Sequence, residues 1–123
     1  MIVDLSGGTN AESYPISYLA DMPSGGWTDE YKTDKLVLRR IKGGKIPTKN
    51  VVVTNDFFIG VFEVTERQYY HVTGTKPSTH NSVSYDSSGV GYDRRPVHDL
   101  SGATICNSTT GFVGKLCSKT KFV

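Results

Sequence analysis

The chain has 123 residues, with 14 basic and 12 acidic side chains and a formal charge of +2. This length suits one domain, and the near balance of charges argues against a dedicated nucleic-acid-binding protein, which carries a clear basic excess. No apolar run approaches the roughly 20 residues that cross a bilayer. The first eight residues lack the basic region of a signal peptide, so we expect a soluble, by default cytoplasmic protein without a membrane partner.

The N-terminal part predicts short strands and turns. Residues 1–5 favour a strand. Residues 13–22 favour a second one, which Pro15 restricts to an edge or irregular position because proline has no amide hydrogen to donate. The sequence PSGG at 23–26 predicts a tight turn, and the single Trp27 is expected to fill the core.

The middle of the chain predicts three further strands. Residues 35–41 alternate in polarity, as a strand does. Residues 57–64 are rich in aromatic and β-branched side chains, which favours a buried strand. Residues 51–53 are expected to pair antiparallel with that strand through a tight turn at Asn55-Asp56.

A helix is predicted directly after residue 64. Thr65 and Gln68 have the spacing of a capping box, in which each side chain bonds the backbone amide of the other residue. Glu66 adds a negative charge in the first turn, where the helix dipole favours it. Gly74 supplies a stop signal, because glycine readily adopts the left-handed conformation that ends a helix.

The C-terminal part predicts a long polar loop at 75–95 and a second helix. Loops of that length are commonly functional. Ser101 is expected to cap the helix, which should end near Lys119 and be firm only from about Thr110 onward.

Cys106 and Cys117 are the only cysteines. On one continuous helix they would lie about 16 Å apart, too far for a disulfide. A break near Gly111 would allow a bridge. The favoured interpretation is two reduced, partly buried structural thiols.

Three blocks carry a family resemblance: KLVLRRI at 35–41, FFIGVFEVTERQY at 57–69 and RPV at 95–97. In sequence, order and spacing they resemble the formylglycine-generating enzyme (sulfatase-modifying factor) family. The resemblance implies an α+β, C-type-lectin-like fold with short antiparallel strands and two helices, truncated to its N-terminal half. The stretches DLSGG at 4–8 and PSGGW at 23–27 look like the N-terminal extension, residues 1–34, of a bacterial subgroup.

The chain also departs from that family. GGKIP at 43–47 stands where members carry a Met-Gly-Ser motif. The half that holds the family's redox-active cysteines, calcium ligands and glycine- and arginine-rich motif has no counterpart within the 123 residues. We therefore assign no catalytic residue, metal or cofactor, and expect a single domain that is not itself an enzyme.

Other candidate chemistry is sparse. His71 is interpreted as a surface or packing residue of the first predicted helix, and His98 as a polar partner of Asp99. The aspartates Asp86, Asp93 and Asp99 only loosely suggest a calcium loop, because the EF-hand spacing is absent.

The leading hypothesis is a non-catalytic module that binds a protein or small ligand through the 75–95 loop. Tyr85, Asp86, Tyr92 and Asp93 are its candidate binding residues, since tyrosine is favoured in binding sites. The alternative is half of an oxidoreductase-type formylglycine-generating enzyme, which regains a site by pairing with a second chain. That chain would be a copy of itself, giving a homo-oligomer, or a separate C-terminal partner.

Overall fold

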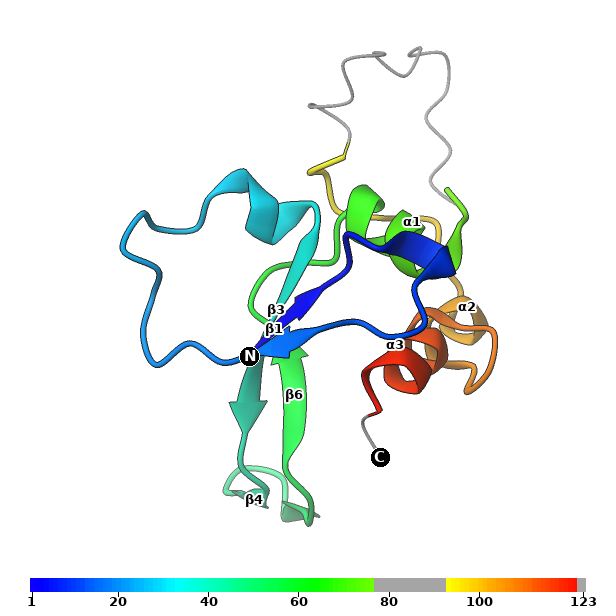
Figure 1. Cartoon of the computed structure of the whole chain (residues 1–123). Coiled ribbons are helices and arrows are strands. Elements are labelled where there is room, and N and C mark those ends of the chain that lie inside the picture. Colours follow the sequence, from blue (N-terminus) through cyan, green and yellow to red (C-terminus); the bar gives the residue numbers. More distant parts are fainter. Residues whose placement is uncertain (77–92, 122–123) are drawn as a thin grey trace.

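The protein is described by a computed structural model for residues 1–76 and 93–121 (Figure 1). These residues form a small α+β domain built on a four-stranded antiparallel sheet, with a separate β-hairpin and two main helices. The order across the sheet is β2 (Ile16–Ser17), β1 (Ile2–Asp4), β3 (Lys35–Ile41) and β6 (Phe57–Gly60). The β2 and β6 strands are thus the two edges of the sheet.

The remaining elements surround this sheet. In Figure 1, α2 and α3 lie together beside the sheet, and the hairpin lies beyond the ends of β3 and β6. Their bounds are η1 (Gly8–Asn10), η2 (Asp29–Lys32), β4 (Gly44–Ile46), β5 (Val51–Val53), α1 (Glu66–Thr73), α2 (Gly102–Cys106) and α3 (Phe112–Thr120). Among the helices of the described ranges, none combines the length and apolar composition that a bilayer crossing requires.

The core lies where β1 and β3 meet α1 and α3. Its buried members come from both strands, both helices and one N-terminal tyrosine: Val3, Leu5, Tyr14, Leu36, Tyr69, Val72, Phe112 and Leu116. A smaller cluster of Ile2, Tyr31 and Val37 lies on the opposite face of the sheet and packs against Trp27 and Phe62. Because neighbouring residues of a strand point to opposite faces, Leu36 and Val37 contribute to different clusters.

The α1 helix begins and ends as predicted. The Thr65 hydroxyl accepts a bond from the Gln68 amide at 3.3 Å, and the Gln68 carboxamide oxygen accepts one from the Thr65 amide at 3.0 Å. Gly74 ends the helix in the left-handed region, at φ 75°. The side-chain nitrogen of Gln68 also donates to the carbonyls of Tyr31 and Lys35. The capping box therefore also fastens the helix to η2 and β3.

The predicted pairing of residues 51–53 with the 57–64 strand is wrong. β5 pairs with β4, and β6 pairs with β3, with Ile41 opposite Phe57 and Leu38 opposite Gly60. The Asp56 carboxylate accepts bonds from the Gly43 amide at 2.9 Å and the Arg40 guanidinium at 2.8 Å. These bonds hold Asp56 against the far end of β3, and the chain continues into β6 without the predicted reversal.

Two other predicted elements are shorter than expected. The strand predicted for 13–22 is reduced to β2. The predicted C-terminal helix is split into α2 and α3, although Ser101 caps its start by accepting a bond from the Thr104 amide. The break has a local cause, because the Asn107 side chain bonds the amides of Thr109 and Thr110 and so forms a turn that competes with the helix.

Candidate functional site

The β6 strand is more exposed to solvent than its sequence predicts. Phe57 is 43% exposed, Ile59 53% and Val61, just beyond the strand, 42%. The prediction of a buried strand over 57–64 is therefore wrong for the described chain: the strand ends at Gly60 and all four of its residues are exposed. A short, continuous apolar run is nevertheless typical of a strand that is covered on both faces.

Next to β6 lies a cavity of about 380 Å³, here called the apolar groove. It runs between the sheet and α3, and its walls contain neither a charged nor a hydroxyl side chain. The lining residues are Leu36, Leu38, Phe58, Gly60, Val64, Ile105, Phe112, Val113, Leu116 and Cys117.

Strand register and helix periodicity explain how these residues meet. Leu38 is opposite Gly60 in the β3–β6 pair. Directly opposed residues of an antiparallel pair lie on the same face of the sheet, and so do residues two apart in a strand. Leu38 and Gly60 therefore share the face on which Leu36 lies. On α3, Phe112 and Leu116 are four residues apart and therefore share the face turned to the sheet.

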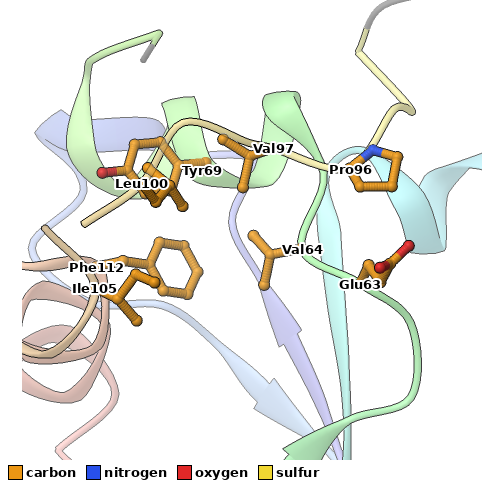
Figure 2. Close-up of a pocket in the computed structure, with 8 residues that line it drawn as sticks. All are labelled: Glu63, Val64, Tyr69, Pro96, Val97, Leu100, Ile105 and Phe112. Carbon is orange, nitrogen blue, oxygen red and sulfur yellow. The ribbon is translucent and has the colours of Figure 1, made fainter. Parts of the chain in front are cut away.

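A second hollow of about 270 Å³ adjoins the apolar groove (Figure 2). It is lined by Glu63, Val64, Tyr69, Pro96, Val97, Leu100, Ile105 and Phe112. Val64, Ile105 and Phe112 line both cavities, and Figure 2 shows the Val64 and Phe112 side chains facing one another. Among these described lining residues Glu63 alone carries a charge. The two cavities are therefore neighbours that share part of their walls.

The structure describes one of the four predicted binding residues. Tyr85, Asp86 and Tyr92 lie outside the described residues. Asp93 forms an ion pair with Arg67 at 3.2 Å, and its backbone carbonyl accepts a bond from the Arg67 amide. The described position of Asp93 is therefore explained by its contact with α1.

His71 and Asp34 complete the cluster around Arg67. The His71 Nε2 atom lies 2.8 Å from an Asp34 carboxylate oxygen and 3.1 Å from the Arg67 Nε atom. His71 is a largely buried packing residue that connects α1 with the segment before β3. The groups in this cluster are paired with one another, which gives them a structural role.

The remaining polar candidates do not converge on a site. His98 and Asp99 form the predicted polar pair at 3.0 Å, and both side chains are about half exposed. Across residues 1–76 and 93–121 no three His, Cys, Asp or Glu side chains are grouped so as to hold a metal ion.

Both cysteines are free thiols. Cys106 is exposed, which corrects the expectation of two partly buried side chains, because it ends the short α2 helix and α2 buries none of its residues. Cys117 is half-buried in the wall of the apolar groove.

No protein-family model, curated protein or solved structure matches the chain. The apolar groove is a candidate binding surface among the described residues. Sequence reasoning did not find it, because its walls come from segments separated by up to about 80 residues. One signal was present: residues 57–61 are apolar on both faces of an edge strand.

Proposed function

We propose that this chain is a non-catalytic binding module whose apolar groove holds a polypeptide segment of a partner. The observation that carries the proposal is the exposed β6 strand beside the uncharged groove. Fully burying an aliphatic or aromatic side chain is worth about 1.5–3 kcal/mol. Contiguous exposed apolar surfaces on soluble domains commonly mark interaction sites.

A polypeptide suits this surface better than a small polar molecule. Pockets for small ligands usually place a few polar groups to fix the orientation of the ligand, and the groove walls have neither charged nor hydroxyl side chains. Apolar exposure also continues outside the cavity to Ile59, whose face of the sheet is opposite to that of the groove. One small molecule cannot cover both faces of β6, whereas a polypeptide that wraps the strand can.

The family resemblance is part of the proposal. The blocks at 35–41 and 57–69 contain β3, β6 and the first half of α1, and the third contributes Pro96, which forms an isolated β-bridge with Thr65. The pairing of β3 with β6 and the bridge between Thr65 and Pro96 bring the first and the third block each into contact with the second. This neighbourhood supports a C-type-lectin-like domain that corresponds to the N-terminal half of a sulfatase-modifying factor. Binding through Tyr85, Asp86 and Tyr92 stays a prediction.

The groove can be tested by selecting from a phage-displayed library of random peptides on the immobilised full chain. We expect enrichment of peptides with closely spaced apolar residues. Binding should be lost in Val113→Asp, because this half-exposed residue lines the groove and an acidic side chain in the first turn of α3 is compatible with the helix. Val52→Asp is the matched control, since Val52 is 61% exposed on β5, away from the groove.

Two kinds of outcome would contradict this proposal. One is a failed peptide selection, in which no peptide is enriched or the enriched peptides bind the wild type and Val113→Asp equally. The other is saturable binding of a fluorescent fatty acid that Val113→Asp abolishes while no peptide competes, which would indicate a hydrocarbon ligand instead.

The second candidate function is half of an oxidoreductase-type formylglycine-generating enzyme completed by a second chain. The same exposed strand supports it, because a second chain that covered β6 would bury Phe57 and Ile59. Incubating the chain with a cysteine-containing peptide and measuring thiol oxidation by mass spectrometry separates the two functions. A non-catalytic module leaves the peptide unchanged, whereas catalysed oxidation supports the enzyme half.

A further inference from the structure

A third cavity, here called the polar pocket, lies where the C-terminal end of α1 meets α2 and α3. Its volume is about 310 Å³, which is at the lower end of the range for pockets that hold small ligands. All of its lining residues except one alanine carry a hydroxyl, amide or ammonium group. They are Tyr69, Thr73, Thr75, Ala103, Thr104, Asn107, Thr110 and Lys115. The chemistry of this pocket is thus the reverse of that of the apolar groove.

Tyr69 gives the pocket a buried hydroxyl group. The residue is 4% exposed, and its ring stacks on that of Phe112 with 5.5 Å between the ring centroids. Figure 2 shows the Tyr69 hydroxyl oxygen at the end of the ring away from Val64 and Pro96, which line the apolar hollow. Among the described residues this hydroxyl has no hydrogen-bond partner. A buried tyrosine hydroxyl usually has one, so it is available to a ligand in the polar pocket.

Three further side chains of the pocket can donate hydrogen bonds to a ligand. Lys115 donates to the Thr73 carbonyl at 3.2 Å, which uses one of its three ammonium hydrogens. The Asn107 side-chain oxygen accepts bonds from two backbone amides of the turn that follows it, which leaves the NH₂ group. The Thr110 hydroxyl forms no hydrogen bond within the part of the chain that the structure describes. The pocket therefore combines one ammonium group with neutral donors.

The charge of the pocket indicates the class of its ligand. Lys115 is the one charged residue in its lining, which contains neither a carboxylate nor an arginine. A phosphate monoester carries close to two negative charges at neutral pH, and proteins commonly bind it with arginines or with several backbone amides. A carboxylate carries a single charge and accepts hydrogen bonds on two oxygens. One ammonium group beside hydroxyl and amide donors therefore fits a carboxylate better than a phosphate.

We infer that the polar pocket binds a small hydroxycarboxylate, whose carboxylate group pairs with the Lys115 ammonium group. The Tyr69 and Thr110 hydroxyls and the Asn107 amide bond the remaining oxygen atoms of the ligand. The inference goes beyond the proposed function, because no residue lines both the polar pocket and the apolar groove. The two sites are therefore open to separate tests.

The inference is tested by titrating the isotope-labelled full chain with gluconate, a six-carbon hydroxycarboxylate, and recording amide NMR spectra. The backbone amide resonances of Asn107, Thr110 and Lys115 should shift and saturate. Glucose has a similar size and similar hydroxyl groups but no charge, so it should bind about tenfold more weakly because the pair with the ammonium group is lost. Inorganic phosphate, at matched ionic strength, should also bind more weakly than gluconate.

Variants of Lys115 test the charged contact. Lys115→Met keeps the length of the side chain without the charge and should weaken gluconate binding by about tenfold or more. Lys115→Arg keeps a cation and should recover part of the affinity. Lys119→Met is the matched control: Lys119 lies on the same helix and also donates to backbone carbonyls, but it does not line the pocket. This control should bind gluconate like the wild type.

Tyr69→Phe separates ligand binding from stability. It removes only the hydroxyl and keeps the ring that stacks on Phe112, so gluconate should bind about three- to tenfold more weakly while the Tm stays unchanged. Tyr14→Phe should behave in the opposite way. The Tyr14 hydroxyl lies outside the pocket and donates to the carbonyls of Gly8 and His71, at 3.1 Å each. Its loss should lower the Tm and leave gluconate binding unchanged.

Shifts that do not saturate with gluconate would overturn the inference, as would equal gluconate binding by the wild type and Lys115→Met. Glucose or phosphate that binds as tightly as gluconate would also overturn it, because the carboxylate would then not be the group that the pocket recognises. The proposed function fails separately. It depends on peptide selection by the groove, which Val113→Asp should abolish without changing gluconate binding, since Val113 does not line the polar pocket.

Discussion

The two ends of β3 have opposite surroundings, although the strand is continuous. Its beginning, at Lys35 and Leu36, lies against α1, where Gln68 is 1% exposed and bonds to three backbone groups. Its far end pairs with β6, whose residues are all exposed. Buried polar groups are costly unless they are paired, and here they are paired. The first region therefore stabilises the fold, while the second leaves apolar side chains exposed.

The largest expected effect on stability comes from Gln68→Ala. It removes the bonds to the Tyr31 and Lys35 carbonyls and to the Thr65 amide, and leaves these backbone groups without that partner. We expect a loss of about 2–3 kcal/mol in the free energy of unfolding, measured by urea denaturation. Tyr70→Ala, on the exposed side of the same helix, is the control. Equal losses in both variants would show that the capping network has no special role.

Thr65→Ala should cost less, about 1–2 kcal/mol. It removes the helix cap and the bond from the Thr65 hydroxyl to the Lys32 carbonyl at 2.7 Å. Thr65→Ser keeps the hydroxyl and should recover most of the stability in the same urea titration. If serine is no better than alanine, the hydroxyl bonds are not the cause.

A smaller loss of stability is expected when the pH is lowered, because Asp56 binds the end of β3. The Gly43 backbone amide and the Arg40 side chain hold the pKa of Asp56 below its ordinary value of 3.8. A carboxyl whose pKa is lower in the folded state stabilises the fold above its unfolded pKa, and this contribution is lost as the pH falls through the folded value. The Gly43 amide resonance in NMR spectra should therefore shift below about pH 4.

Asp56→Asn isolates the contribution of Asp56. A separate test is needed because the bond to Arg94 also lowers the pKa of Asp29, whose titration would act in the same direction. The asparagine variant should lose the shift at Gly43 and keep any shift near Asp29. An unchanged Gly43 titration in Asp56→Asn would exclude Asp56 as its source.

The smallest effect on stability is expected at the exposed strand itself. Ile59→Ser should change the free energy of unfolding by less than about 0.5 kcal/mol, as surface substitutions usually do, since Ile59 is 53% exposed. It should nevertheless weaken peptide binding in the display assay. A large loss of stability would mean that the described domain already uses Ile59 in its packing.

Local signals in the sequence predicted local structure well. Thr65, Gln68 and Gly74 lie within ten residues of one another, and each was assigned its observed role in α1. The strand at 35–41 was predicted with its observed bounds because alternation is read from neighbouring residues. The weak first half of the C-terminal helix was also predicted, since the helix was expected to be firm only from about Thr110 and α3 begins at Phe112, but the turn that the Asn107 side chain forms was not.

Long-range structure was not predictable in the same way. The pairing of β6 with β3 rather than β5 is accompanied by a bond between Gly43 and Asp56, and periodicity reveals neither contact. Burial of residues 57–64 was inferred from their apolar composition. Composition indicates that such a strand favours a covered position, but not whether another segment covers it. The groove joins β3, β6, α2 and α3, so it exists only once the chain has folded.

The two thiols lie in different surroundings, and this gives the molecule an internal reporter. Cys117 is part of the groove wall, whereas Cys106 is exposed. Alkylation by a small maleimide, read residue by residue in a mass spectrometer, would compare their labelling rates within one sample. An occupied groove would slow labelling at Cys117 and leave Cys106 as the reference, so occupancy can be followed on the unmodified sequence without a dye or a tag.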